Sequence, residues 1–139
     1  MKQSLQPGVS VVRRFVVDED RTISFMGDEG RVYGTPNFVR DAEHLCRDLL
    51  LEHADAGEDS VGIEVIIRHT AASLLGMEVE ITATVMEVEG RKVTFEVSAR
   101  DDLEPIGGGS HTRFVVDVAK THERLKAKAA KRTAAAGSG

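Results

Sequence analysis

The chain has 139 residues, enough for one ordinary domain with a single core and too few for two of typical size. Its formal net charge of -5, with 41% hydrophobic and 29% charged residues, is typical of a soluble folded protein and excludes a disordered or fibrous one. Aromatic residues make up only 4% of the chain, which argues against base stacking on single-stranded RNA, so nucleic acid is not an expected partner.

Cysteine and apolar content indicate the compartment. The single cysteine, Cys46, cannot form an internal disulfide or a cysteine-based metal site, which favours a reducing compartment. No stretch approaches the roughly 18 to 20 apolar residues of a membrane helix, and residues 1–10 lack the apolar core of a signal peptide. We therefore expect a cytoplasmic protein without a membrane partner. The histidines form no metal-ligand spacing, so no metal or bound cofactor is expected.

In chain order, the first predicted elements are a strand at about residues 10–17 and one long helix. Thr35-Pro36 is a helix start signal, because the hydroxyl can cap the helix and proline's missing N–H costs nothing at the first helical position. A broad apolar stripe with helical spacing follows, and residues 54–59, with Gly57, end it. The stripe consists of Phe38, Val39, Ala42, Leu45, Cys46, Leu49 and Leu50.

The later sequence predicts antiparallel strands. Apolar and polar residues alternate over residues 77–85 and 92–99, and Glu89-Gly90-Arg91 between them predicts a hairpin. Further strands are expected at about 60–70 and 110–118. Gly107-Gly108-Gly109 lacks the Lys-Ser/Thr of a phosphate loop and is interpreted as a flexible turn or a bulge entering the last strand. At least five strands and one long helix predict an α+β fold in which a sheet wraps the helix.

Charge divides the chain into a body and a tail. From Lys120 to Arg132 there are six basic residues and one acidic residue, a charge of +5, whereas residues 1–119 carry 12 basic and 22 acidic groups, a charge of -10. We expect residues 1–119 to form a single domain and residues 120–139 a basic, alanine-rich C-terminal helix or tail that is partly disordered. The tail is either a solvated terminal helix or a binding segment for nucleic acid or a phosphate-rich ligand.

Two polar residues interrupt predicted apolar faces. Glu43 lies four residues after Val39 and three before Cys46, so its carboxylate is either partly desolvated beside the core or reaches solvent at the edge of the stripe. His69 closes the apolar face formed by alternate residues from Val61, where it is either a hydrogen-bonded core residue or a catalytic one. If this strand packs on the helix, Glu43 and His69 point into the same layer, as a carboxylate that orients a catalytic imidazole would.

Thr35 is a third candidate. As the N-cap it either only satisfies backbone N–H groups or, at a helix end with positive potential, helps to hold a developing oxyanion. The other histidines are less promising: His44 and His53 fall beside charged residues, His111 is on the alternate face from Phe114, and His122 lies in the basic tail.

The three candidates occur in an ordered pattern. Thr35, Glu43 eight positions later and His69 a further 26 positions on resemble the catalytic set of the fluoroacetyl-coenzyme A thioesterase family. The similarity covers roughly residues 33–118. It continues through the short segments Arg68-His69-Thr70-Ala71-Ala72, Val88-Glu89-Gly90-Arg91, Val97-Ser98-Ala99 and Ile106-Gly107, up to His111 and Arg113.

The resemblance implies a hot-dog fold, a long helix wrapped by an antiparallel sheet, in a homodimer with active sites at the subunit interface. It implies an acyl-CoA thioesterase that hydrolyses a short-chain acyl-CoA, its small-molecule partner, to the acid and free CoA. His69 would be the general base and acid, Glu43 would either attack the thioester carbonyl or orient His69, and Thr35 with nearby helix amides would hold the carbonyl oxygen. Gly62 and Arg113 match positions that contact the acyl end.

Two features bear on the substrate. The family's fluoroacetyl enzyme closes its acyl pocket with bulky aromatic residues before the helix, whereas residues 26–34 here are a different, glycine-rich stretch, so the acyl group is left unassigned. CoA carries several phosphates, which Arg91 or Lys92 would steer. The alternatives are a hot-dog hydratase or dehydratase acting on enoyl thioesters, and a non-catalytic acyl-thioester-binding protein.

Overall fold

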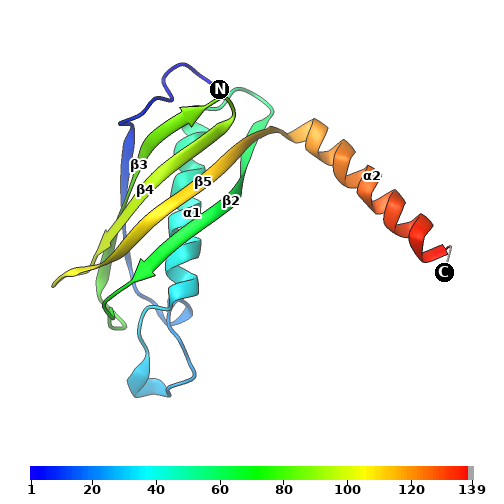
Figure 1. Ribbon diagram of the computed structural model, residues 1–139. Helices are drawn as coiled ribbons and strands as arrows, with labels where there is room; N and C mark the ends of the chain where they lie inside the picture. Colours follow the sequence, from blue (N-terminus) through cyan, green and yellow to red (C-terminus); the bar gives the residue numbers. More distant parts are fainter. Residues whose placement is uncertain (138–139) are drawn as a thin grey trace.

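The computed structural model describes residues 1–137 and contains one antiparallel sheet and two long helices. The sheet has the strand order β1-β3-β4-β5-β2, and Figure 1 shows it curved around α1. This arrangement confirms the predicted α+β fold with one helix wrapped by a sheet. In chain order the elements are β1 (Ser10–Val16), two short 3-10 turns (Glu19–Arg21 and Asp28–Gly30), α1 (Thr35–Glu52), β2 (Glu58–His69), β3 (Glu78–Glu89), β4 (Lys92–Arg100), β5 (Pro105–Asp117) and α2 (Val118–Gly137).

The core lies between α1 and the inner face of the sheet. Alternate residues of β3 and β4 are buried, as the period-two pattern predicts, and they pack against the apolar stripe of α1. Gly90 joins these two strands with a φ of 61°, which glycine adopts without steric cost. The largest fully buried side chains of the core include Phe38, Leu45, Ile81 and Phe95.

The start of α1 differs from the prediction. Thr35 is the first helical residue rather than the N-cap, and Gly34 takes the cap position with an extended backbone and no side-chain hydrogen bond. The Gly34 carbonyl accepts the first intrahelical bond, from the Phe38 N–H, at 3.0 Å. Because Thr35 does not cap its own helix, its hydroxyl is available to another partner. Pro36 is thus the second helical residue rather than the first, and it still lies in the first turn, where its missing N–H costs nothing.

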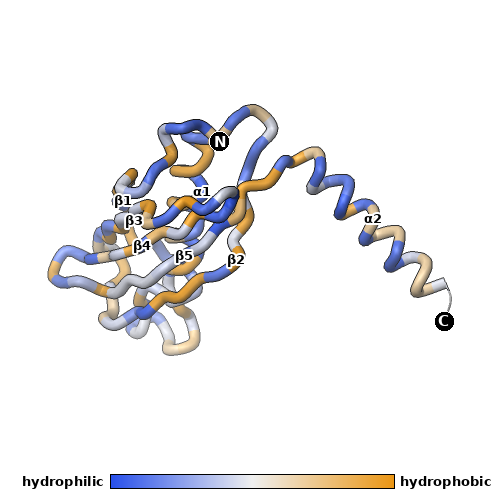
Figure 2. The backbone as a smooth tube through the Cα atoms, turned by 45° about the horizontal axis from the view of Figure 1, so that its top comes forward, coloured by the Kyte–Doolittle hydropathy of each residue, from blue (hydrophilic) through white to orange (hydrophobic). Residues whose placement is uncertain are grey.

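The prediction that Val61 shares the inner, apolar face of β2 with Ile67 and His69 is wrong. The pairing of β2 with β5 contains a bulge between Gly62 and Glu64, so the side-chain alternation changes face at Ile63. Val61 therefore lies opposite Phe114 and is exposed, while Ile67 and His69 beyond the bulge face inward and are partly buried. β2 is also an edge strand, and Figure 2 shows its hydrophobic run along the border of the sheet.

The three consecutive glycines lie inside β5 and do not form a flexible turn. A Cβ atom at Gly109 would overlap the Ile66 carbonyl oxygen, and one at Gly107 would overlap the Arg68 carbonyl oxygen. Glycine is required here because the backbones of β2 and β5 approach closely.

The second helix extends from the end of β5 away from the body (Figures 1 and 2). α2 begins at Val118, two residues before the predicted tail, and none of its described residues is buried. Residues 138 and 139 of the predicted tail lie outside the described residues. Within residues 1–137, neither helix is long and apolar enough to cross a membrane.

Candidate active site

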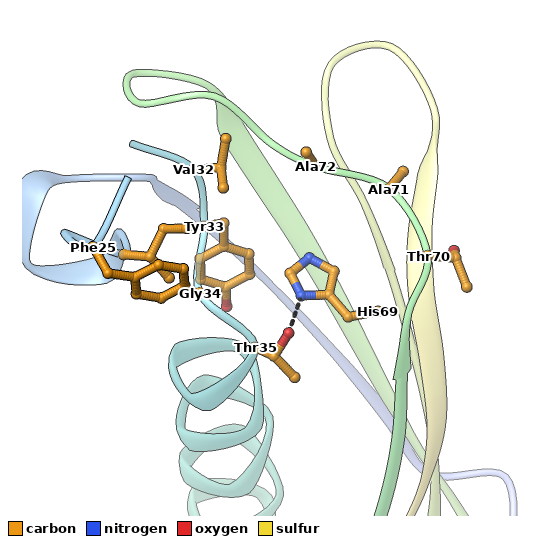
Figure 3. A pocket seen from close by; sticks show the side chains of 10 residues that line it. Phe25, Val32, Tyr33, Gly34, Thr35, His69, Thr70, Ala71 and Ala72 are labelled. Atoms are coloured by element: carbon orange, nitrogen blue, oxygen red, sulfur yellow. Dashed lines mark hydrogen bonds between the residues drawn. The ribbon is translucent and has the colours of Figure 1, made fainter. Parts of the chain in front are cut away.

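A cavity of about 320 Å³ opens at the N-terminal end of α1 (Figure 3). Its walls come from the loop before α1, the first residue of the helix and the end of β2 with the segment that follows. The lining residues are Ile23, Phe25, Val32, Tyr33, Gly34, Thr35, His69, Thr70, Ala71 and Ala72. Phe25, which immediately precedes the glycine-rich stretch, thus places one aromatic ring on the wall of this cavity.

Thr35 and His69 meet in this cavity. The Thr35 Oγ1 and His69 Nδ1 atoms are 2.9 Å apart and form a hydrogen bond, drawn in Figure 3. The imidazole is held edge-on by Tyr33 and Phe38, whose ring centroids lie 5.8 Å and 5.3 Å from its own. Two of the three predicted catalytic side chains are therefore brought together by the fold.

The second ring nitrogen of His69 has no partner. Within residues 1–137, His69 Nε2 is a buried side-chain nitrogen that makes no hydrogen bond. Burial lowers the pKa of His69 from its ordinary value of 6.5, against a smaller opposing effect of the Ala71 backbone. The imidazole is therefore neutral at pH 7 and can accept a proton, which is the state that a general base needs.

Glu43 belongs to a second cluster, further along α1. It lies eight residues after Thr35, which is about 12 Å along the helix axis. Within one chain, the two side chains therefore lie in different parts of the structure. The Glu43 Oε1 atom is 3.9 Å from Nε2 of His111, and it borders Gly62. A Cβ atom at Gly62 would lie 2.9 Å from Glu43 Oε1 and 3.1 Å from His111 Cε1, so a larger residue there would displace the Glu43 carboxylate.

Arg113 completes the second cluster from β5. Its guanidinium is buried and donates to Ser60 through Nε (2.7 Å to Oγ) and Nη2 (2.8 Å to the carbonyl oxygen). Arg113 lies directly opposite Gly62 in the β2–β5 pairing. The structure therefore brings Gly62 and Arg113, the two positions that the resemblance assigns to the acyl end, together with Glu43.

Two further residues line this cluster: His111, which the sequence analysis set aside as less promising, and Ser60, which it did not consider. His111 is 1% exposed and touches both Glu43 and Arg113. The sequence could have indicated His111 because it lies two residues before Arg113, and residues two apart on a strand share a face. Within the described part of the chain, no group of three or more His, Cys, Asp or Glu residues could hold a metal ion.

Solved structures of other proteins share this architecture. A hot-dog-like protein from Thermanaerovibrio acidaminovorans, 24% identical, superposes with a TM-score of 0.81 over 88% of this chain and 91% of its own. A thioesterase superfamily member from Thermus thermophilus, 30% identical, superposes with a TM-score of 0.83 over 96% of this chain and 98% of its own. Fold and site thus define a hot-dog protein of the thioesterase class.

The family described as fluoroacetyl-CoA-specific thioesterase matches residues 17–119, and the chain belongs to this family of thioester hydrolases. The fluoroacetyl-CoA thioesterase of Streptantibioticus cattleyicolor is 30% identical over 135 residues, which cover 92% of this chain and 97% of that protein. A solved fluoroacetyl-CoA thioesterase superposes with a TM-score of 0.81, and variants of it have been solved with fluoroacetate and CoA or with acetyl-CoA. The predicted fold and family are confirmed.

Proposed function

We propose that this protein hydrolyses a short-chain acyl-CoA to the acid and free CoA, with the reacting carbonyl in the cavity of Thr35 and His69. The observation that carries the proposal is the Thr35–His69 hydrogen bond, which leaves His69 Nε2 without a partner in a cavity of about 320 Å³. The fluoroacetate and acetyl-CoA held by variants of the related enzyme support a short acyl group.

His69 serves as the general base and then the acid. When Nδ1–H donates to Thr35 Oγ1, the Nε2 lone pair is free to take a proton from an attacking water. The oxygen of that water bonds to the thioester carbon and forms a tetrahedral intermediate. Collapse of the intermediate breaks the carbon–sulfur bond, and the imidazolium returns its proton to the departing CoA thiolate.

Thr35 holds the oxyanion. In this tautomer of His69 the Thr35 oxygen accepts from Nδ1–H, so the Thr35 O–H remains able to donate to the carbonyl oxygen. The backbone N–H groups in the first turn of α1 and the positive end of the helix dipole add to this stabilisation.

A homodimer would supply Glu43 to the same reaction. β2 is an edge strand whose unpaired backbone groups can pair with another strand, and it carries exposed apolar side chains. Antiparallel pairing of β2 with its copy would bring the His69 end of one protomer toward the Gly62 segment of the other. Glu43 would then act in one of two ways, with Gly62 and Arg113 at the acyl end. It would attack the carbonyl in place of water, expelling the CoA thiolate and forming an acyl-enzyme anhydride that water activated by His69 hydrolyses, or it would take the place of Thr35 as the group that orients His69. The exposed apolar side chains of β2 are Val61, Ile63, Val65 and Ile66, and exposed Phe114 of β5 lies opposite Val61.

The test is a panel of short acyl-CoAs assayed for release of free thiol. We expect turnover by the wild type and losses of about 100-fold to 10,000-fold in kcat/KM for His69→Ala, which removes the base. Thr35→Ala should lose about 100-fold or more and Thr35→Ser much less, because serine keeps the hydroxyl. Glu43→Gln should lose most of the activity, since the amide is neither a nucleophile nor a base.

Matched controls are Glu52→Gln and His44→Ala, which alter an exposed carboxylate and an exposed imidazole of the same helix. Both should keep wild-type rates. Equal rates in wild type, His69→Ala and Glu43→Gln would refute the assignment of these residues, and a wild type without thiol release on every substrate would refute the proposed hydrolysis.

A further inference from the structure

Arg113 is a buried cation whose donors need acceptors. It is 6% exposed, and burial lowers its pKa, because a charged group loses solvation inside the protein. Two of its nitrogens donate to Ser60. The third, Nη1, lies 3.2 Å from Nε2 of His111.

This contact determines the tautomer of His111. A guanidinium can only donate hydrogen bonds, so Nε2 of His111 must be the acceptor. Nδ1 then carries the ring proton and donates to the carbonyl oxygen of Glu64, at 2.8 Å. Both ring nitrogens are thus used, and the ring links the residue after the β2 bulge to Arg113.

His111 also stands between two opposite charges. Its Nε2 atom is 3.2 Å from Arg113 Nη1 and 3.9 Å from Glu43 Oε1. Among the ion pairs of residues 1–137, none joins Glu43 directly to Arg113. The neutral ring therefore accepts a hydrogen bond from the guanidinium and lies within 3.9 Å of the carboxylate.

We propose that His111 is a positioning residue, which holds the Arg113 guanidinium at Gly62 through the lone pair of Nε2 and thereby leaves the Glu43 carboxylate free. Its effect on turnover rests on the proposed function, in which Arg113 contacts the acyl group and Glu43 acts on the carbonyl. Removal of the acceptor leaves Nη1 without its hydrogen-bond partner, and Glu43 is the carboxylate whose charge acts most strongly on Arg113. Such a pair would withdraw both residues from the substrate.

Two substitutions separate positioning from packing. His111→Phe keeps a flat ring of similar volume and removes both nitrogens, whereas His111→Gln keeps an acceptor near the position of Nε2. We expect kcat/KM to fall about tenfold to 100-fold in His111→Phe, as for loss of a hydrogen bond to a charged group, and to recover most of this loss in His111→Gln. Discrimination between acyl groups should fall along with kcat. The control is Thr112→Val, which alters a buried residue next to His111 on β5 without touching the hydrogen bonds of His111.

The tautomer provides a readout that does not depend on activity. Long-range ¹H–¹⁵N correlation spectra of the wild type at pH 7 should show His111 neutral, with the proton on Nδ1. In Arg113→Met this signal should change, because Nε2 loses its donor. If no acyl-CoA is turned over, the proposed function fails, and these spectra still decide the role of His111.

Three results would overturn the proposal. One is a cationic His111 or a proton on Nε2 at pH 7. Another is a folded His111→Phe variant with wild-type kcat, KM and acyl discrimination. The third is a His111→Gln variant as impaired as His111→Phe, since this would show that the acceptor is irrelevant.

Discussion

His69 and His111 are neutral for the same physical reason and use that state differently. Burial is the largest cause that lowers the pKa of each ring below the ordinary value of 6.5. Backbone groups at Ala71 and Glu64 oppose this effect in part, and at His111 the Arg113 charge adds to it. His69 leaves one nitrogen free for chemistry, whereas His111 has both nitrogens engaged.

These shifts predict how stability depends on pH. Each histidine has a lower pKa in the folded than in the unfolded state, so the unfolded chain binds more protons below about pH 6.5. Their contribution to stability is therefore present above pH 6.5 and is lost as the pH falls through the folded-state pKa. We expect the thermal midpoint to decrease from pH 7 to pH 5.

Single substitutions show which histidines cause the decrease of the thermal midpoint at acid pH. His69→Gln and His111→Gln should each flatten this acid decrease, whereas His122→Gln, in the exposed helix α2, should not. Midpoints measured by circular dichroism across this range check the prediction. A slope that stays the same in both buried-site variants would contradict it.

At the scale of elements, the β2–β5 pair positions both clusters. The bulge after Gly62 turns Val61 outward and keeps Ile67 and His69 inward, so one strand contributes to an exposed edge and to the cavity. The glycines of β5 let the two backbones approach each other closely. The geometry of the site therefore depends on residues that carry no functional group.

Gly109→Ala should destabilise this pair. The new Cβ would overlap the Ile66 carbonyl oxygen, and that backbone atom cannot move without opening the β2–β5 ladder. We expect a loss of about 1–3 kcal/mol in the free energy of unfolding, measured by urea denaturation. Ser110→Ala, at the next residue, is the control and should change it little. An unaltered urea midpoint for Gly109→Ala would show that the strands are less closely packed.

At the scale of the molecule, the proposed site residues of one chain fall into two groups. Thr35 and His69 lie at the N-terminal end of α1, while Glu43, Gly62, His111 and Arg113 lie about two helical turns away. In the proposed homodimer each complete site takes one half from each copy. Complementation between inactive variants can reveal this arrangement.

Co-expression of His69→Ala and Glu43→Gln chains should restore activity. In a mixed dimer one site combines the intact His69 half with the intact Glu43 half, and the other site carries both defects. Random pairing yields half mixed dimers, so about a quarter of wild-type activity is expected, against almost none for either variant alone. Thiol release by the purified mixture is the measurement.

The control is co-expression of His69→Ala with Thr35→Ala. Both defects lie in the same half-site, so no mixed dimer has an intact site and activity should stay low. Recovery in this control, or its absence in the first mixture, would argue against a site shared between copies.

The elements and the family could be predicted from the sequence because their signals are local. Alternation in β3 and β4, the turn at Gly90 and the apolar stripe of α1 each depend on neighbouring residues along the chain. The ordered set of Thr35, Glu43 and His69 indicated the family, and Thr35 with His69 lies at the end of α1 where we propose the chemistry.

Only the tertiary structure decided how these residues group. The register of β2 against β5 depends on a bulge that no local pattern marks, so the outward turn of Val61 was not predictable. The same long-range pairing buries His111 beside Arg113 and directs Glu43 toward them, away from the histidine that sequence spacing suggested. Residue types thus specified the chemistry, and strand register determined which of them meet.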